Sequence, residues 1–545
     1  MRYIRYMSIF LILFVLNGFS MFGSNSSSSN SGSMFNLGGS SSSSDKCNKL
    51  DPKVQIISSN DDWKHINDDN KRVFCVNPGD YSSLGVIEIT SSGTKDEPRY
   101  IYLNESSDDH PAKLVDDFVN KDNWDKKLAK YRIKLKNANY WVIDRLAYWE
   151  DPNPFNEVIT LDNSSNNTIS RALIVDTANG IGLKDGSNNN KIEKSHIEKT
   201  KWSVDYAKNS LKNGPFDSDG YVKYEYQIFA DMAAIGLEGT KNSSILNNTI
   251  ENNEIINFVD AIQLTRVTYG STAKNIDFAG TKIVDNLLYV TPDIYTDCNA
   301  KFTKDGDCSV SENAIDIKAG SKDSDNPIEI KNNIMFGFKQ SDSNFYSPDN
   351  KIDDAGSAIV SHYYVRNVNI EDNLIFNTNF GIDSDGPLEK KIAFRDITIN
   401  NNTFYNNKYF EIILVGTQSG KYDGAKNINI TKNTFANNKE VIDSPTVELY
   451  NTQKINIDNN LFVYNYGFWT PFDFKGYENV NNKKLAITNN TFYSKNVEEA
   501  KDSIPKNVEA HDNNFTDEDF DFSTIDREYK TRKFTSNPQK HNLVE

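Results

Sequence analysis

The sequence has few of the residues that mark metal-binding, nucleic-acid-binding or membrane-spanning proteins. Its 545 residues include only 4 cysteines and 6 histidines, so a metal site built from these residue types has few candidates. The formal net charge of -16 argues against a nucleic-acid partner, because neutralising phosphates requires a basic surface. The long apolar run at the N-terminus is too short to cross a bilayer comfortably.

The N-terminal segment indicates export. MRYIRYMSIFLILFVLNGFSMFG combines two arginines, an apolar run and small residues, which is typical of a secretory signal peptide over residues 1–23. An uncleaved membrane anchor is the alternative. Residues 24–45 are nearly all Ser, Gly and Asn and predict a flexible linker. We therefore expect a secreted, periplasmic or cell-surface protein with no stable membrane span after signal removal.

The four cysteines form two pairs that are close in sequence, Cys47 with Cys75 and Cys298 with Cys308. In an exported protein, two disulfides are the natural interpretation. A metal site is the alternative.

A short pattern recurs down the chain: isoleucine, two variable residues, asparagine and an apolar pair. Ala172 and Ser195 occupy the asparagine slot in two early copies, and the later copies carry Asn253, Asn286, Asn333, Asn373, Asn402, Asn433, Asn460 and Asn490. Neighbouring slots are 23, 58, 33, 47, 40, 29, 31, 27 and 30 residues apart. The fixed isoleucine and aromatic partners exclude a mere Asn-rich low-complexity tract.

Such a period is typical of a solenoid, in which each coil buries its isoleucines only when the next coil stacks on it. Asparagine tolerates the left-handed backbone of a tight corner, and its amide can bond to the asparagine one coil above. Because parallel crossovers are almost always right-handed, the fold class predicted is all-β, a single-stranded right-handed parallel β-helix. We expect it over residues 46–495, with an N-terminal cap around residues 112–131 and a C-terminal cap or tail over 496–545. We expect a monomer.

A second set of aligned segments includes AIGLEG, AIQLTR, AIDIKA, AIVSHY and GIDSDG. In each, the isoleucine and the residue two positions later should face inward, so the alternate residues should line a groove. Three of these segments arrive late in their coils, so we expect long loops near 203–230, 290–312 and 341–356 on one edge. Aromatic residues in such loops, among them Tyr295 and Tyr346, would stack on sugar rings.

The outward positions bring together a lysine, a histidine and several carboxylates. With coils about 4.8 Å apart, Lys318 and His362 would be neighbours. Such a set suits proton abstraction from a uronic acid, which needs a base, a cation for the carboxylate and an acid for the leaving oxygen. Lys318 would be the base if like-charged or apolar surroundings lowered its pKa. Asp316 would instead hold it charged as the neutralising cation, and His362 or Tyr363 would then take the proton. Arg266 is the next cationic candidate.

The remaining outward residues are candidates for calcium or substrate binding. Calcium prefers hard oxygen ligands, and the candidate ligands are Glu238, Asp316, Asp383 and Asp385. The candidate substrate-binding residues are Glu238, Gln263, Asp316, Tyr364, Tyr295 and Tyr346. An ordinary salt-bridged surface is the alternative for Lys318 and His362.

Two resemblances support these expectations. The turns PGDY and SGT, within residues 78–94, look like those of the first coil in pectate-lyase-like β-helix proteins. The strands AIDIK and AIVSHYY resemble the active-site strands of polysaccharide lyase family six, the chondroitinase B and alginate lyase group. Lys318 matches the family lysine and His362 the family histidine, whereas Ser361 stands where the family has arginine.

The function predicted is a secreted polysaccharide lyase that cleaves an acidic, uronic-acid-containing polysaccharide by β-elimination. One alternative is a non-catalytic carbohydrate-binding or adhesin-like solenoid. Another is a β-helix glycoside hydrolase or epimerase; the hydrolase would require a tight cluster of groove aspartates.

Overall fold

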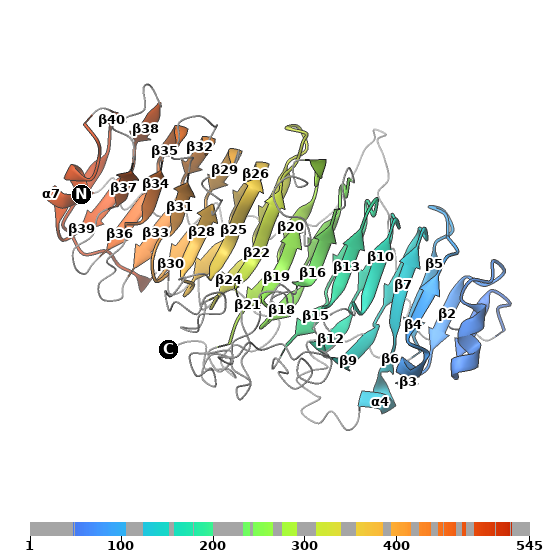
Figure 1. The fold of residues 1–545 in the computed structure, drawn as a ribbon. Helices are drawn as coiled ribbons and strands as arrows, with labels where there is room; N and C mark the ends of the chain where they lie inside the picture. The colour runs from blue at the N-terminus through green and yellow to red at the C-terminus, as the bar shows by residue number, and fades with distance from the viewer. Residues whose placement is uncertain are drawn as a thin grey trace, which may run out of the picture. The chain divides into compact units, whose positions relative to one another are not determined.

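The protein winds into coils that each contain three short strands (Figure 1). The computed structural model describes residues 47, 50–104, 124–151, 157–177, 179–199, 233–239, 244–264, 275–291, 312–338, 356–384, 394–415, 425–437, 445–450, 452–464, 471–475, 484–506, 508–523 and 525. The predicted signal peptide and linker, residues 1–45, lie outside these ranges. Within them, no helix is long and apolar enough to cross a membrane.

The strands of the described residues form three parallel sheets, here called A, B and C. Sheet A contains β1 (Val54–Ile57), β2 (Val73–Val76), β5 (Arg99–Leu103), β8 (Trp141–Asp144), β11 (Thr168–Ser170), β14 (Lys191–Glu193), β17 (Thr249–Glu251), β20 (Lys282–Val284), β23 (Ile328–Lys331), β26 (Arg366–Glu371), β29 (Arg395–Asn400), β32 (Lys426–Thr431), β35 (Gln453–Asp458), β38 (Leu485–Thr488) and β40 (Glu509–His511). Sheet B contains β3 (Gly79–Asp80), β6 (Ala129–Lys130), β9 (Ala147–Asp151), β12 (Leu173–Thr177), β15 (His196–Glu198), β18 (Glu254–Ile256), β21 (Leu287–Tyr289), β24 (Ile334–Phe336), β27 (Leu374–Phe376), β30 (Thr403–Tyr405), β33 (Thr434–Asn437), β36 (Leu461–Tyr464), β39 (Thr491–Ser494) and β41 (Asn514–Thr516). Sheet C contains β4 (Val86–Ile89), β7 (Arg132–Lys136), β10 (Ile159–Asp162), β13 (Ile181–Lys184), β16 (Ala233–Glu238), β19 (Asp260–Leu264), β22 (Asn313–Ala319), β25 (Ser357–Tyr364), β28 (Phe380–Ser384), β31 (Ile412–Val415), β34 (Val447–Tyr450) and β37 (Phe472–Lys475).

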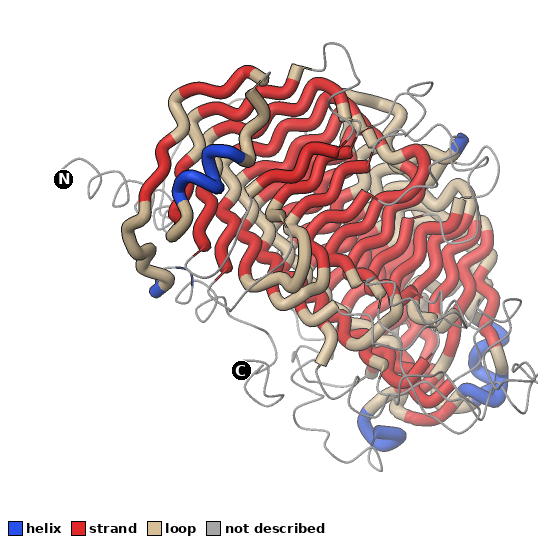
Figure 2. The backbone as a smooth tube through the Cα atoms, turned by 60° about the vertical axis from the view of Figure 1, so that its left-hand side comes forward, coloured by secondary structure: helices blue, strands red, loops and turns tan. Residues whose placement is uncertain are grey.

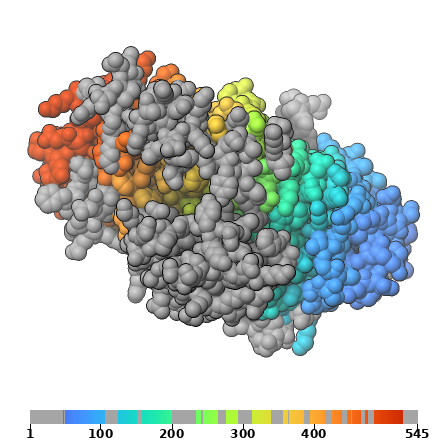
Figure 3. Space-filling model, viewed as in Figure 1, coloured from blue at the N-terminus to red at the C-terminus, as the bar shows by residue number. Residues whose placement is uncertain are grey.

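From β2 to β39 successive strands pass from sheet A to B to C, so a coil in this range adds one strand to each sheet (Figure 2). At the C-terminal end of the described residues, β39 of sheet B is followed directly by β40 of sheet A. The coils follow in chain order from the blue N-terminal end to the red C-terminal end (Figure 3). All strand pairs between coils are parallel, as in β22 with β25. The predicted fold, an all-β right-handed parallel β-helix, is confirmed.

The asparagine ladder runs along the corner between sheets A and B. The backbone N–H and the side-chain Nδ2 of Asn333 both donate to Oδ1 of Asn373 one coil further on, at 2.9 and 3.0 Å. The same Nδ2 donates to the carbonyl of Ile283 in the preceding coil at 2.8 Å. Each ladder amide therefore joins three coils, and the buried polar groups of this corner are paired.

One detail of the predicted corner is wrong. The left-handed residue is not the ladder asparagine but the residue before it, for example Asn332 (φ 57°), Asp372 (φ 58°) and Lys432 (φ 57°). The reversal of the backbone directly precedes the ladder residue, whose side chain can then point into the corner. In different coils this left-handed position is occupied by Asn, Asp or Lys. A single residue can adopt such a backbone conformation at a turn.

The interior is a continuous apolar core made of aligned rows. Ile235, Ile262, Ile315, Ile359 and Ile382 pair in register along sheet C and are at most 1% exposed. On sheet B, Phe404, Phe435, Phe462 and Phe492 stack coil on coil with ring centroids 4.8 to 5.0 Å apart. The predicted inward rows therefore form the core that holds the sheets in register.

The N-terminal end is closed by aromatic side chains. The 3-10 helix η2 (Asn60–His65) buries Trp63 against Tyr81 and Tyr131. Tyr81 belongs to the predicted PGDY turn and precedes the short 3-10 helix η3 (Ser82–Leu84). Of the cap expected at residues 112–131, the described part contains the single-turn helix α4 (Trp124–Lys127) and strand β6, while residues 105–123 lie outside the described ranges.

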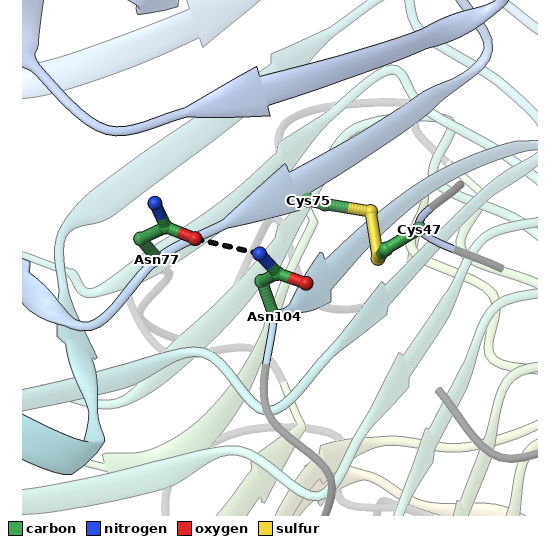
Figure 4. The surroundings of a disulfide bond; sticks show 4 residues. All are labelled: Cys47, Cys75, Asn77 and Asn104. Carbon is green, nitrogen blue, oxygen red and sulfur yellow. Dashed lines mark hydrogen bonds between the residues drawn. A yellow bond between two sulfur atoms is a disulfide. The ribbon is translucent and has the colours of Figure 1, made fainter. Parts of the chain in front are cut away.

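The disulfide between Cys47 and Cys75 is confirmed (Figure 4). It ties residues ahead of β1 to strand β2 of sheet A. Beside it, Asn104 Nδ2 donates to Asn77 Oδ1 at 2.7 Å. The other predicted pair, Cys298 with Cys308, lies outside the described residues.

The coils continue past residue 495. After helix α7 (Val497–Asp502), β40 pairs with β38 and β41 pairs with β39. Asn513 extends the ladder from Asn490, and Phe515 stacks on Phe492 at 4.7 Å. The solenoid therefore includes part of the segment that the sequence assigned to a cap or tail, because the short motif DNNF repeats the coil pattern.

Along β21, β24 and β27 the outer face of sheet B is apolar and buried. Outward-facing Tyr289, Phe336 and Phe376 are 1 to 3% exposed and stack on one another at 4.9 and 4.5 Å. Phe520 packs on Tyr493, and Phe522 packs on Tyr405. The segment after β41 thus returns along this face and covers part of it.

Candidate active site

Lys318 and His362 project from adjacent strands of sheet C and meet at a buried carboxylate. Lys318 Nζ lies 2.8 Å from Asp316 Oδ2, and His362 Nε2 lies 3.4 Å from Asp316 Oδ1. Asp316 is only 4% exposed, whereas the side chains of Lys318 and His362 are 17% and 21% exposed. The carboxylate is therefore held inside, and the lysine and histidine beside it have access to solvent.

The surroundings of Asp316 favour its charged form. Burial by itself would raise the pKa of this carboxyl, but the charges of Lys318 and His362 and the hydrogen bonds it accepts outweigh that effect. Its pKa consequently lies below the ordinary value for aspartic acid. An ammonium this close to a stable carboxylate is itself favoured in the charged form.

Asp316 belongs to a buried network of hydrogen bonds. Gln263 Nε2 donates to Asp316 Oδ2 and to Asp260 Oδ2, both at 3.0 Å. Asn313 Nδ2 donates to Asp260 Oδ1 at 3.1 Å. Gln263 and Asp260 are fully buried, so Gln263, predicted to bind substrate, instead bridges two carboxylates.

The strand that carries His362 contains an irregularity. Ile315 to Ile317 pair with Ile359 to Ser361, but Ala319 pairs with Tyr364, so β25 has one extra residue opposite Lys318. Such a β-bulge re-aims side chains. Tyr364 consequently packs against the interior core, rather than facing the groove as the sequence predicted.

The carboxylates proposed as calcium ligands do not converge in the described part of the chain. Glu238 pairs with Lys184 at 3.5 Å, and Asp316 is held by Lys318. Asp383 lies on β28, beside Val360 of β25. Among the described residues no group of three or more His, Cys, Asp or Glu side chains could hold a metal ion. Asp385 lies outside them, so calcium stays a prediction, and no chemical step below uses it.

Several predicted site residues lie outside the described ranges: Arg266, Asp385, Tyr295 and Tyr346. Tyr363 belongs to β25, but its side chain is not described. The roles of these residues stay predictions.

The three long loops all connect sheet B to sheet C. They join β15 to β16, β21 to β22 and β24 to β25. These are the positions predicted from the extra residues before AIGLEG, AIDIKA and AIVSHY. Tyr289, which ends β21 directly before the second loop, is 1% exposed and donates its hydroxyl to Glu254 on the outer face of sheet B.

Sequence reasoning missed Asp260 and Asn313. Both stand two residues before the aligned isoleucine of their strand, in VDAIQL and ENAIDIK, and Ser357 has the same position in GSAIVSHY. A shared polar residue at this position was the available signal. Strict alternation does not assign it to the groove, because the backbone is still leaving the corner.

No protein-family model matches this chain, and no curated protein matches it. Among solved structures, it is similar to an alginate lyase from Paenibacillus sp. str. FPU-7, with 15% identity over 78% of this chain and 98% of that one and a TM-score of 0.37. It is also similar to a mannuronic acid specific polysaccharide family 6 lyase from human gut microbiota, with 13% identity over 90% and 97% and a TM-score of 0.49. A mannuronan C-5 epimerase A-module from Azotobacter vinelandii shows 10% identity over 82% and 91%, with a TM-score of 0.32. At these identities the likeness concerns the fold.

Proposed function

We propose that the protein cleaves a uronic-acid-containing polysaccharide by β-elimination on the outer face of sheet C. The observation that supports this is the cluster of Lys318, Asp316 and His362, in which a buried carboxylate holds an ammonium and an imidazole at the solvent boundary. A substrate carboxylate would find a positive charge there, and a proton acceptor would lie beside it.

Lys318 neutralises the substrate carboxylate in this proposal. Its ammonium contacts Asp316 at 2.8 Å, which favours the charged form and makes it a poor base. As the C5 proton leaves, negative charge develops on the uronate carboxylate, and a nearby ammonium stabilises the resulting enolate.

His362 takes the C5 proton. The electron pair of the broken C–H bond then forms the C4–C5 double bond, and the bond from C4 to the glycosidic oxygen breaks. The departing oxygen receives a proton from solvent water. Asp316, 3.4 Å from His362 Nε2, stabilises the imidazolium formed in the first step.

The test is to incubate the protein with alginate, pectate and glycosaminoglycans and to follow the ultraviolet absorbance of the unsaturated uronate. Lys318→Ala and His362→Ala should each lower kcat by at least about a hundredfold while thermal unfolding stays close to wild type. Lys184→Ala on the same face, three strands away, is the matched control and should retain most of the activity.

Other outcomes would replace the proposal. Reducing ends without absorbance indicate a hydrolase, and inverted uronates in an uncut chain indicate an epimerase. Binding without any chemical change indicates a non-catalytic carbohydrate-binding protein. Full activity in both Lys318→Ala and His362→Ala would remove this cluster as the reaction centre.

A further inference from the structure

Three aromatic side chains gather at the corner between sheets B and C, where strands β28 and β31 of sheet C begin. Phe380, Tyr409 and Phe410 are each partly exposed. The ring of Phe380 lies 5.5 Å from that of Tyr409 and 6.1 Å from that of Phe410, the latter at an interplanar angle of 9°. Lys408 Nζ lies 4.5 Å from the centroid of the Tyr409 ring. This set, here called the aromatic platform, presents ring surface and a positive charge together.

The corner that carries the platform is held by hydrogen bonds from the preceding coil. The backbone N–H groups of Lys408 and Tyr409 donate to the carbonyls of Thr378 and Asn379, at 2.8 and 2.9 Å. Asn407 accepts from the Thr378 hydroxyl at 2.8 Å.

A buried carboxyl also braces this corner. Asn407 Nδ2 donates to Glu411 Oε2. Burial raises the pKa of Glu411 to about 8, although the Asn407 hydrogen bond opposes this rise, so its carboxyl is mostly neutral at pH 7. Rings held on a rigid corner lose little entropy when a ligand stacks on them.

The platform lies in line with the network beneath the reaction centre. Asp260 pairs with Asn313, Asn313 with Ser357, and Ser357 with Phe380, so these positions form one row across four adjacent strands. His362 is five residues beyond Ser357 on β25, roughly 16 Å along the strand at about 3.3 Å per residue. The platform is therefore on the same side of the coil as Lys318 and His362, several sugar units away.

We infer that the aromatic platform is a binding subsite for a uronate residue of the same polysaccharide chain, an inference that rests on the proposed function. The apolar face of the sugar ring stacks on Tyr409 and Phe410, and Lys408 attracts its carboxylate. We expect an acidic occupant because Lys408 places a positive charge at the edge of the platform, although the protein as a whole has a net charge of -16. The subsite adds affinity only for chains long enough to span both positions.

The experiment compares chain lengths. For whichever polymer of alginate, pectate or glycosaminoglycan is cleaved, Tyr409→Ala and Phe410→Ala should raise KM about five- to tenfold on the polymer and leave kcat unchanged. On a trisaccharide of the same sugar, which cannot reach from His362 to the platform, both variants should match wild type. Tyr409→Trp should retain the wild-type KM on the polymer, because it keeps a ring for stacking.

Tyr100→Ala, which removes a partly exposed tyrosine from sheet A, is the control and should change neither KM. An unchanged polymer KM in both platform variants would overturn the subsite while leaving the lyase intact. An equal loss on trisaccharide and polymer would also overturn it, because the damage would then be general.

If no elimination occurs with any polymer, the subsite is tested by retardation of the full-length protein in native gels containing alginate, polygalacturonate or chondroitin sulfate. Retardation by one polymer that Tyr409→Ala abolishes supports the subsite and rejects the lyase. Retardation that persists in Tyr409→Ala and Phe410→Ala, or no retardation of the wild type by any polymer, rejects the subsite.

Discussion

From β21 onward, the outer face of sheet B is apolar, whereas the outer face of sheet C carries polar and charged groups, although both sheets are built from strands with the same period. On sheet B the outward row contains Tyr289, Phe336 and Phe376, which are almost fully buried. On sheet C the outward positions contain Asp316, Lys318 and His362, and the lysine and histidine side chains are partly exposed. A solenoid thus has one outer face that serves stability and another that is available for chemistry.

The difference follows from what covers each face. Phe520, Phe522 and Ile525 belong to the apolar cluster on sheet B, so the chain itself removes that face from water. The polar groups of sheet C are instead satisfied by one another, through Gln263, Asp260 and Asn313. The buried polar network holds its side chains through directional hydrogen bonds. The apolar row is stabilised mainly by the apolar surface area that it removes from water.

The largest effect is expected on sheet B. Phe376→Asp would place a carboxylate in an apolar row where the ring now stacks on Phe336 at 4.5 Å. We expect a loss of about 3–5 kcal/mol or more in the free energy of unfolding, measured by urea denaturation. Phe376→Leu, which stays apolar, should lose much less. Wild-type stability in Phe376→Asp would show that this face does not contribute to the fold.

The next effect is on sheet C and should separate stability from activity. Gln263→Met keeps the volume but removes the donors to Asp260 and Asp316, which should cost about 1–3 kcal/mol of stability and lower kcat more than it changes KM. Leu264→Ala, on the same strand but facing the core, should lower stability without changing the kcat of the folded protein. Equal kcat in Gln263→Met and wild type would limit the network to a structural role.

The third prediction concerns how the stability of the protein depends on pH through a histidine of sheet B. His196 lies between Glu254 and Glu198, at 2.9 and 3.0 Å, and Tyr289 donates to Glu254 at 3.2 Å. Burial alone would lower the pKa of His196, but the two carboxylates outweigh it and raise the pKa to about 10. Because the folded-state pKa is raised, this stabilisation is complete below pH 6.5 and is lost as pH rises through about 10.

Wild-type stability should therefore decline between pH 7 and 10 by up to about 1.4 kcal/mol per pH unit from this group, and His196→Gln should lack that slope. Urea denaturation at pH 6, 8 and 9.5 measures it. His511→Gln, at an exposed histidine, should keep the wild-type slope. Parallel pH profiles for wild type and His196→Gln would contradict the assignment.

The smallest effect is expected for an ordinary ion pair on sheet C. Lys134 Nζ lies 2.9 Å from Asp162 Oδ2, and both side chains are about a third exposed. Lys134→Ala should change the free energy of unfolding by less than about 1 kcal/mol, because solvent screens such pairs. Thermal and urea denaturation both check it, and a loss above about 2 kcal/mol would mean that polar contacts on sheet C stabilise the fold as strongly as apolar ones on sheet B.

Much of the fold could be predicted from the sequence because its determinants are local and repeated. The recurring slot from Asn253 to Asn490 marks one corner of every coil, and alternation along AIDIK and AIVSH assigns Lys318 and His362 to the same side. A period of two along a strand and a nearly constant coil length leave few other arrangements.

The tertiary structure alone decided the contacts that cross between coils without a repeat. The pairing of Ala319 with Tyr364 beyond the extra residue of β25 joins positions 45 residues apart. The hydrogen bond from Gln263 to Asp316 joins positions 53 apart, and the contact of Phe380 with Tyr409 joins positions 29 apart. The return of Phe520 and Phe522 along sheet B is of the same kind. Sequence periodicity shows which residues share a row, but which partners a side chain reaches depends on packing between coils, and periodicity does not encode that.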